Sequence, residues 1–215
     1  MTDRTTTLAR IEQGGVIAVL RGVEPAHVEP IATALVDGGI TAIEVTADTP
    51  GVADLVSTLD TVVDGAAAIG AGTVLDAATA RTVLLAGAEF IVTPTLDVGV
   101  IETANRYGVP VVPGIMTPTE AQRAMEAGAD AVKLFPAATV GPNHLRAING
   151  PLEQIPIVPT GGIDLDNAAD YIAAGAIGVG VGGALLDADL IGAEDWASLA
   201  ERARDFVEVV ETARG

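Results

Sequence analysis

One lysine stands out among the residues that could carry out chemistry. Lys133 is the only lysine in a chain of 215 residues, whose other basic side chains are arginines. It lies in the middle of a short apolar run, residues 131–135. Arginine supplies positive charge as well as lysine does, but it cannot act as a neutral nucleophile. A lysine in this setting therefore favours an amine that attacks a carbonyl group.

Two simpler interpretations of Lys133 remain open at this point. Its stem could be buried while the ammonium group reaches water. It could also form a structural ion pair with Glu44, which lies in another apolar run, because a buried ammonium and a buried carboxylate each need a partner. In the catalytic interpretation, Lys133 forms a covalent adduct and Glu44 moves protons. An apolar wall from Phe135 and Leu134 and a positive charge from Arg21 would both favour the neutral amine.

Two glycine pairs indicate where an anion could bind. Gly161-Gly162 and Gly182-Gly183 follow the last two of the chain's apolar runs. We expect each pair to stand at the start of a helix, where exposed backbone N–H groups and the positive helix end hold phosphate. Tight turns also use glycine pairs, so the signal depends on their position after these two strands.

The elements that would position these residues recur along the chain. Eight apolar runs alternate with stretches of helical spacing, which predicts one domain, residues 1–215, with the α/β architecture of a (β/α)8 TIM barrel. We also expect a short N-terminal helix over residues 6–13 and an amphipathic C-terminal helix whose apolar stripe runs from Trp196 to Val210. The predicted strands are residues 16–20, 40–45, 67–71, 90–93, 109–112, 131–135, 155–159 and 176–181.

The active site of such a barrel lies at the carboxyl ends of its strands. Period-two alternation puts Lys133 and Phe135 on one face of the sixth strand and Glu44 on the corresponding face of the second. Strands two and six have the same parity, so we expect Lys133 and Glu44 to face each other across the mouth. The small residues Ala42 and Ala131 beneath them leave room. Other polar residues at strand ends are Arg21, Thr46, Thr73, Thr93, Thr95 and Thr160.

The composition argues against several classes of function. A formal net charge of −18 opposes binding to nucleic acid or to an anionic membrane. The absence of cysteine excludes thiol nucleophiles and thiolate metal sites, and His27 and His144 do not form a metal-ligand spacing, so we expect no metal. No apolar run is long enough for a signal sequence or a membrane span, which predicts a cytoplasmic protein. The acidic, lysine-poor composition predicts a halophilic protein adapted to a salt-rich cytoplasm.

Six short segments, in this order along the chain, match the motifs of a known family. They are Gly38-Gly39 with Ile43-Glu44-Val45-Thr46, Gly70-Ala71-Gly72-Thr73-Val74, Ile91-Val92-Thr93-Pro94, Val112-Pro113-Gly114-Ile115, Val132-Lys133-Leu134-Phe135-Pro136-Ala137 and Pro159-Thr160-Gly161-Gly162. Through them, the chain from about Gly15 to Leu186 resembles the 2-keto-3-deoxy-6-phosphogluconate (KDPG) aldolases, which are class I, Schiff-base enzymes.

The resemblance implies roles for the matching residues. It implies that Lys133 forms the Schiff base and that Glu44 is the general acid and base. Thr73 and the segment around Pro94 would help to hold the pyruvate moiety. The resemblance also implies a (β/α)8 barrel, a homotrimer, and no metal or other cofactor. The residues expected to cradle phosphate are Gly161, Gly162 and Gly183.

Two departures from the family pattern concern substrate binding. Many relatives have an arginine four residues after the glutamate, where this chain has Asp48. We expect Arg21 to replace the missing contact. Some relatives have serine in the last phosphate loop, where this chain has Ala184.

The combined prediction is reversible cleavage of KDPG to pyruvate and glyceraldehyde 3-phosphate. Alternative aldolase substrates are the galacto epimer and 4-hydroxy-2-oxoglutarate. A barrel isomerase or epimerase could instead use Glu44 as a base and Lys133 only as an electrostatic clamp. A third alternative is a non-catalytic protein that binds a phosphorylated metabolite or serves in assembly.

Overall fold

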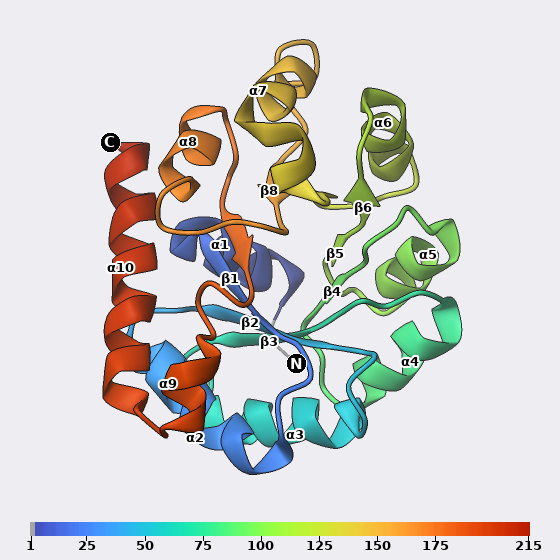
Figure 1. Ribbon diagram of the computed structural model, residues 1–215. Helices are drawn as coiled ribbons and strands as arrows, with labels where there is room; N and C mark the ends of the chain where they lie inside the picture. The colour runs from blue at the N-terminus through green and yellow to red at the C-terminus, as the bar shows by residue number, and fades with distance from the viewer. Residues whose placement is uncertain (1–2) are drawn as a thin grey trace.

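Parallel strands alternate with helices along the chain, and the helices lie around the strands (Figure 1). The computed structural model describes residues 3–215. The strands are β1 Val16–Leu20, β2 Ala42–Thr46, β3 Ala68–Gly72, β4 Phe90–Val92, β5 Val111–Val112, β6 Gly114–Ile115, β7 Val132–Leu134, β8 Ile157–Pro159 and β9 Val179–Val181. The helices are α1 Arg4–Gly14, α2 Pro25–Asp37, α3 Val52–Val63, α4 Ala77–Leu85, α5 Val98–Arg106, α6 Pro118–Glu126, α7 Ala137–Asn149, α8 Ala168–Ala173, α9 Ala188–Gly192 and α10 Trp196–Arg214.

The strands form two curved parallel sheets. One sheet has the order β5-β4-β3-β2-β1-β9, and the other has the order β6-β7-β8. Chain connectivity brings the sheets together at one end, because only Pro113 separates β5 from β6. At the other end, Thr160 beyond β8 forms an isolated parallel bridge with Gly180 of β9. The fold class is therefore α/β with parallel strands, as the sequence predicted.

Each predicted strand has a counterpart, but the fifth differs from the prediction. The ladder stops at Val112 and resumes as β6, Gly114–Ile115. Pro113 has no backbone N–H and so interrupts the ladder. Its carbonyl oxygen nevertheless accepts a hydrogen bond from the backbone N–H of Lys133, at 2.8 Å. The missed strand β6 thus lies directly beside the strand that carries the lysine.

Apolar side chains form two separate clusters, one on the inner faces of the strands and one on their outer faces. The inner cluster contains Ala42 and Ala131, the small residues predicted beneath Glu44 and Lys133, together with Ile17, Ala68, Phe90 and Val158. The outer cluster contains Val132 and Leu134 of β7, with apolar residues from the surrounding helices. Strand alternation therefore orients Lys133 as predicted, toward the inside.

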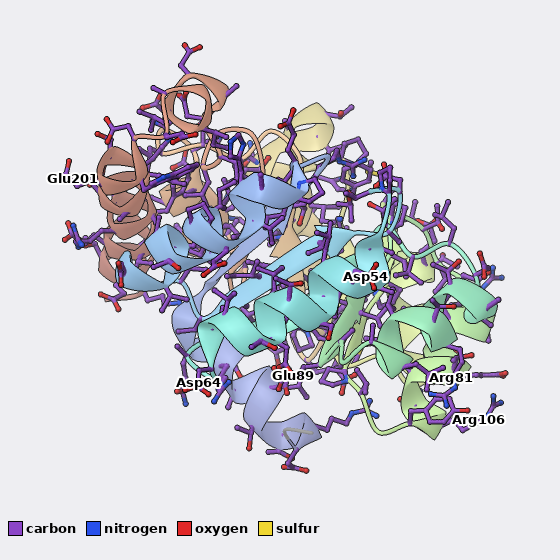
Figure 2. All side chains as sticks on the ribbon, turned by 90° about the horizontal axis from the view of Figure 1, so that it is seen from below. Asp54, Asp64, Arg81, Glu89, Arg106 and Glu201 are labelled. Atoms are coloured by element: carbon purple, nitrogen blue, oxygen red, sulfur yellow. The ribbon has the colours of Figure 1, made fainter. Side chains whose placement is uncertain are left out.

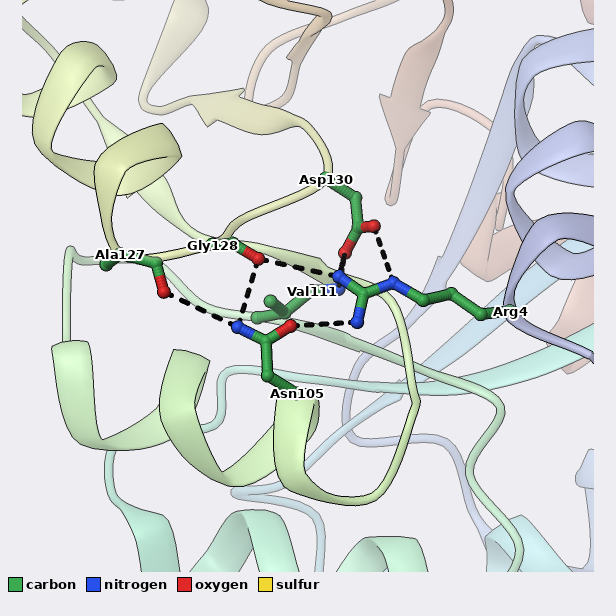
Figure 3. A network of polar contacts seen from close by, with 6 residues as sticks. All are labelled: Arg4, Asn105, Val111, Ala127, Gly128 and Asp130. Atoms are coloured by element: carbon green, nitrogen blue, oxygen red, sulfur yellow. Dashed lines mark hydrogen bonds and ion pairs between the residues drawn. The ribbon is translucent and has the colours of Figure 1, made fainter.

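Helix α1 covers the end of the strands opposite to their carboxyl ends. Its Ile11 is buried in the inner cluster. Arg4 forms a bidentate pair with Asp130, both contacts being 2.8 Å, and donates to the side-chain oxygen of Asn105 at 2.8 Å (Figure 3). Asp130 also accepts a hydrogen bond from the backbone N–H of Val111. Because bidentate arginine–carboxylate pairs have a defined geometry, this network fixes α1 against the starts of β5 and β7.

Side-chain hydrogen bonds order the chain at or just before the starts of α6 and α8. Thr117 and Glu120 form a capping box at the start of α6. Asp164 accepts hydrogen bonds from the backbone N–H groups of Asp166 and Asn167, in the turn before α8. Along α10, Leu199, Ala203, Phe206 and Val210 are buried against neighbouring helices. Among the helices of residues 3–215, none has the length and apolar character to cross a membrane.

Candidate active site

Lys133 is buried inside the fold, near the carboxyl ends of the strands. It pairs in register with Gly114 of β6 and Val158 of β8, and its side chain is 4% exposed. The amine nitrogen Nζ lies 4.9 Å from the centroid of the Phe135 ring. Phe135 is thus an aromatic wall beside the amine, as expected, whereas Leu134, expected in the same wall, packs in the outer cluster because alternation turns it to the other face. Such a buried side chain does not place its head group in bulk water, so the simple snorkelling interpretation does not describe Lys133.

Glu44 is the second buried ionisable residue of this region. It lies on β2, in register with Val19 of β1 and Gly70 of β3, and is 1% exposed. Burial raises the pKa of the Glu44 carboxyl group, because a charged carboxylate loses its hydration there, while the positive charges of Lys133 and Arg21 lower it. Burial is the largest of these effects. The result is a carboxyl group that holds a proton more readily than an exposed glutamate does.

Glu44 and Lys133 interact electrostatically without direct contact. Within residues 3–215, no carboxylate oxygen lies within 4.0 Å of the Lys133 amine, and Oε1 of Glu44 has no hydrogen-bond partner. A structural ion pair is therefore not formed. Gly72 makes room for the carboxyl group, because a Cβ atom at this position would lie 2.3 Å from Oε1 of Glu44. An unpartnered buried carboxyl oxygen costs free energy of folding, and a catalytic role would explain why it is kept.

Arg21 is held at the mouth by two side chains. Its guanidinium group donates to Oδ2 of Asp48 and to Oγ1 of Thr73, each at 3.0 Å. The Arg21 and Asp48 side chains are more than half exposed. Thr73 has a φ of 55°, which is rare for a β-branched residue and is typical of functional sites. Asp48, the residue that departs from the family pattern, thus binds the arginine expected to compensate for it.

A pocket of about 380 Å³, which we call the main pocket, opens at the carboxyl ends of the strands. It brings together residues that are far apart in sequence. Besides predicted site residues, its lining includes Val19, Asp164 and Ala184. Glu44 does not line the main pocket, but it is in register with Val19, which does. Thr73 contacts the lining residue Arg21, and the backbone of Pro94 packs against Gly114 of β6, beside β7. The predicted site residues that line the main pocket are Arg21, Lys133, Phe135, Thr160, Gly161, Gly162, Gly182 and Gly183.

The two glycine pairs lie in loops and not at helix starts, which corrects the prediction. Helix α8 begins at Ala168 and α9 at Ala188, each several residues after its glycine pair. Gly161 and Gly162 have φ values of 92° and 76°, a left-handed geometry that turns the chain before a helix can begin. Any anion here would be bound by loop amides, without the direct help of these helix ends.

Thr49 is a supporting residue that sequence reasoning missed. The hydroxyl groups of Thr46 and Thr49 lie 3.1 Å apart, and Thr49 also accepts a hydrogen bond from the backbone N–H of Gly22. These contacts connect the loop after β2 to the loop that carries Arg21. Thr49 had no signal in the sequence, because its role depends on how that loop folds back. The two glycines of Gly70-Ala71-Gly72 were a usable sequence signal, because they indicate a strand with little room for side chains.

The fold and the site together define a class of protein. A buried amine with a nearby but unpaired carboxyl group, at the carboxyl ends of parallel strands, is typical of lysine-dependent carbonyl chemistry. The family described as KDPG and KHG aldolase matches residues 8–202, so the chain belongs to this aldolase family. Aldolases are carbon–carbon lyases, which makes this the activity class of the protein.

Curated relatives and solved structures agree with this family. The KHG/KDPG aldolase of Escherichia coli K12 is 35% identical, over 95% of this chain and 96% of its own length. A probable 2-dehydro-3-deoxy-6-phosphogalactonate aldolase of Rhizobium meliloti is 37% identical, over 79% of this chain and 80% of its own length. A Legionella pneumophila KDPG aldolase structure, with pyruvate captured as a covalent carbinolamine, is 30% identical, with a TM-score of 0.86 and coverage of 92% and 96%.

Proposed function

We propose that this protein is a class I aldolase that reversibly cleaves KDPG, a 2-keto-3-deoxy-6-phospho sugar acid, to pyruvate and glyceraldehyde 3-phosphate. One observation carries the proposal: the amine of Lys133 and the carboxyl group of Glu44 are both buried, and they influence each other without forming an ion pair. A site of this kind leaves both groups available to a substrate between them.

The proposed reaction uses Lys133 as nucleophile and Glu44 as proton carrier. The neutral amine attacks the C2 carbonyl carbon, and Glu44 protonates the departing hydroxyl group, so that water leaves and an iminium forms. Glu44 then removes the proton of the C4 hydroxyl group while the C3–C4 bond breaks. The bond electrons enter the iminium, which becomes an enamine. Protonation of the enamine at C3 and hydrolysis then release pyruvate and the free amine.

Substrate binding is assigned to groups around the main pocket. We propose that Thr73 and Pro94 hold the pyruvate moiety, and that Phe135 and Thr160 line the sugar carbons. The loop amides of the two glycine pairs would hold the phosphate group, since backbone N–H groups are good anion ligands. Arg21, fixed by Asp48 and Thr73, would contribute a positive charge at the mouth. No metal is needed, because the iminium itself accepts the electrons.

The full architecture and the assembly are also part of the proposal. We propose that the two sheets form one closed (β/α)8 barrel, supported by the Thr160–Gly180 bridge and by the continuity of β5 and β6 through Pro113. We further propose a cytoplasmic homotrimer. Large exposed apolar side chains on the adjacent helices α4 and α5, or within two residues of them, support an association surface, which light scattering of the purified protein would test; they are Leu75, Leu85, Val98 and Tyr107.

A second candidate substrate is the galacto epimer. Relatives named for the galactonate substrate match this chain about as well as those named for the gluconate substrate. The substitution of Asp48 for the expected arginine also concerns the part of the site that contacts substrate. The third aldolase candidate, 4-hydroxy-2-oxoglutarate, is suggested by the relatives that carry both names.

Pyruvate release under steady-state conditions tests the proposal. KDPG, its galacto epimer, their unphosphorylated forms and 4-hydroxy-2-oxoglutarate should be compared by kcat/KM. We expect the highest value for a phosphorylated substrate and a complete loss of cleavage in Lys133→Arg, which keeps the charge but not the nucleophile. An isomerase would release no pyruvate, and a binding protein would tolerate the substitution. Either result would reject the aldolase.

A further inference from the structure

One buried hydroxyl group bridges the seam between the two sheets. The edge strand β5 of one sheet leads through Pro113 into β6, the edge strand of the other (Figure 1). Thr93 directly follows β4, the neighbour of β5, and its side chain is buried. Its hydroxyl group accepts a hydrogen bond from the backbone N–H of Gly114, at 3.3 Å, and donates one to the carbonyl oxygen of Thr95. A hydroxyl group can do both at once, because it has one donor and two acceptor sites.

The Thr93 hydroxyl group takes the place of a backbone acceptor in the ladder. The backbone N–H of Thr93 donates to the carbonyl oxygen of Val112 in β5, at 3.2 Å. In a regular parallel ladder, the next donor is the N–H of Gly114 and its acceptor is the carbonyl oxygen of Thr93. Here the side chain of Thr93 accepts that bond, and the main chain is free to turn at Pro94. Loss of the hydroxyl group would remove a partner from the buried N–H of Gly114, which is unfavourable.

The segment held in this way connects two parts of the candidate active site. Pro94, part of the proposed pyruvate site, directly follows Thr93. Its backbone packs so closely on β6 that a Cβ atom at Gly114 would lie 2.2 Å from the carbonyl carbon of Pro94. Gly114 is in register with Lys133, whose backbone N–H donates to the carbonyl oxygen of Pro113 at 2.8 Å. Hydrogen bonds and packing therefore connect Thr93 to the strand that carries the amine.

We propose that Thr93 is a positioning residue, whose hydroxyl group fixes the Pro94 segment against β6 at the distance from Lys133 that bound pyruvate requires. This inference rests on the proposed Schiff-base function. Thr93 is not among the residues that line the main pocket, so it acts through its neighbours and not by contact with substrate. Without the hydroxyl group, the Pro94 segment shifts and binds the pyruvate moiety more weakly. The bond-breaking steps at Lys133 and Glu44 change less than the affinity does.

Two substitutions separate the hydroxyl group of Thr93 from its methyl group. Thr93→Val keeps the shape without the hydroxyl group, and Thr93→Ser keeps the hydroxyl group alone. Each protein is equilibrated with increasing pyruvate and reduced with a pulse of borohydride, and the adduct is counted by mass spectrometry. Thr93→Val should raise the half-saturating pyruvate concentration about fivefold, through loss of one buried hydrogen bond, and Thr93→Ser should restore it. An unchanged concentration in Thr93→Val, or an equal rise in Thr93→Ser, would overturn the inference.

A matched threonine on α5 controls for a general loss of stability. Thr103 is also buried, and its hydroxyl group donates to the carbonyl oxygen of Gly99 at 2.7 Å. Thr103→Val therefore removes a buried side-chain hydrogen bond outside the site, and it should leave the half-saturating concentration unchanged, whatever its effect on Tm. An equal rise in Thr103→Val and Thr93→Val would contradict a specific role of Thr93. If Thr93→Val does not fold, Thr93→Ala is compared with Thr93→Ser, because it also lacks the hydroxyl group.

The failure of this inference is distinguishable from failure of the aldolase proposal. Cleavage kinetics give a second readout, because Thr93→Val should raise KM about fivefold and change kcat by less than about twofold. If the unchanged protein gains no pyruvate adduct and cleaves no substrate, the Schiff-base function and the role of Thr93 are both rejected. If it is trapped and active, while Thr93→Val has the same half-saturating concentration and the same KM, only the role of Thr93 is rejected.

Discussion

Glu44 has the environment expected of a proton-transfer group, because burial raises its pKa above the usual 4.5. The acid limb of the kcat/KM profile for cleavage should therefore lie at a higher pH than an exposed glutamate would produce. Glu44→Gln should lower kcat by about 100-fold or more and remove this limb, because glutamine cannot accept the proton. Pyruvate release measured from pH 4 to pH 9 in both proteins checks this. An unchanged acid limb in the variant would assign it to another group.

The same raised pKa predicts how stability depends on pH. Between the usual pKa of 4.5 and the raised pKa, the folded chain binds more protons at Glu44 than the unfolded chain does. This residue therefore lowers the free energy of unfolding as the pH rises through that interval. Glu44→Gln should be more stable than the unchanged protein at pH 8, and the gain should shrink toward pH 4. Urea unfolding at both pH values measures it, and a gain independent of pH would contradict the origin assigned here.

Substitutions at Arg21 and Asp48 test whether Asp48 holds Arg21 in its position at the mouth. Arg21→Ala should raise KM about tenfold, with a smaller effect on kcat, because it removes the positive charge that we propose to contact bound substrate. Asp48→Ala should raise KM less, since the pair is exposed and such pairs are weak. Asp48→Asn is the control, because it keeps an oxygen that can accept the hydrogen bond. If Asp48→Ala leaves KM unchanged, Arg21 does not need Asp48 for its position.

At the scale of elements, strand β3 has no room for side chains at Gly70 and Gly72, because side chains of neighbouring strands occupy that space. A Cβ atom at Gly72 would lie 2.3 Å from Oε1 of Glu44, and one at Gly70 would lie 2.5 Å from the Phe90 ring. Both Gly→Ala variants should lose about 1–3 kcal/mol of unfolding free energy through overpacking. Only Gly72→Ala should also change the acid limb of the pH profile, because only it displaces Glu44. An identical pH profile in the two variants would show that Gly72 has no special relation to Glu44.

The elements that sequence reasoning predicted are those whose local pattern agrees with their packing. Apolar runs with period-two alternation located the strands, and the same alternation placed Lys133 and Glu44 on inner faces. What it missed depends on three-dimensional context. The contact of Arg21 with Asp48 joins residues on two separate loops, and β6 continues a ladder beyond a proline. The glycine pairs were assigned to helix starts because the left-handed geometry at Gly161 and Gly162 is not encoded in spacing alone.

For the whole molecule, the net charge of −18 is the dominant electrostatic feature. Exposed acidic side chains lie at both ends of α3, at Asp54 and Asp64, and on α10, at Glu201 (Figure 2). Salt screens repulsion among them, so raising KCl from 0.1 M to 2 M at pH 7 should increase Tm by about 5 °C. The increase should largely disappear near the isoelectric point of about 4.1. A Tm that falls with added KCl at pH 7 would contradict adaptation to high salt.

Reductive trapping tests the central claim that Lys133 forms a Schiff base. The protein is incubated with pyruvate and sodium borohydride, digested, and analysed by mass spectrometry. Because the chain has one lysine, an adduct on a lysine side chain can only be on Lys133, and the digest separates its peptide from the one that carries the α-amino group. We predict one reduced pyruvate on the peptide that contains Lys133, a parallel loss of cleavage activity, and no such adduct in Lys133→Arg. Saturating pyruvate that leaves this peptide unmodified, while the enzyme still cleaves its substrate, would contradict the account.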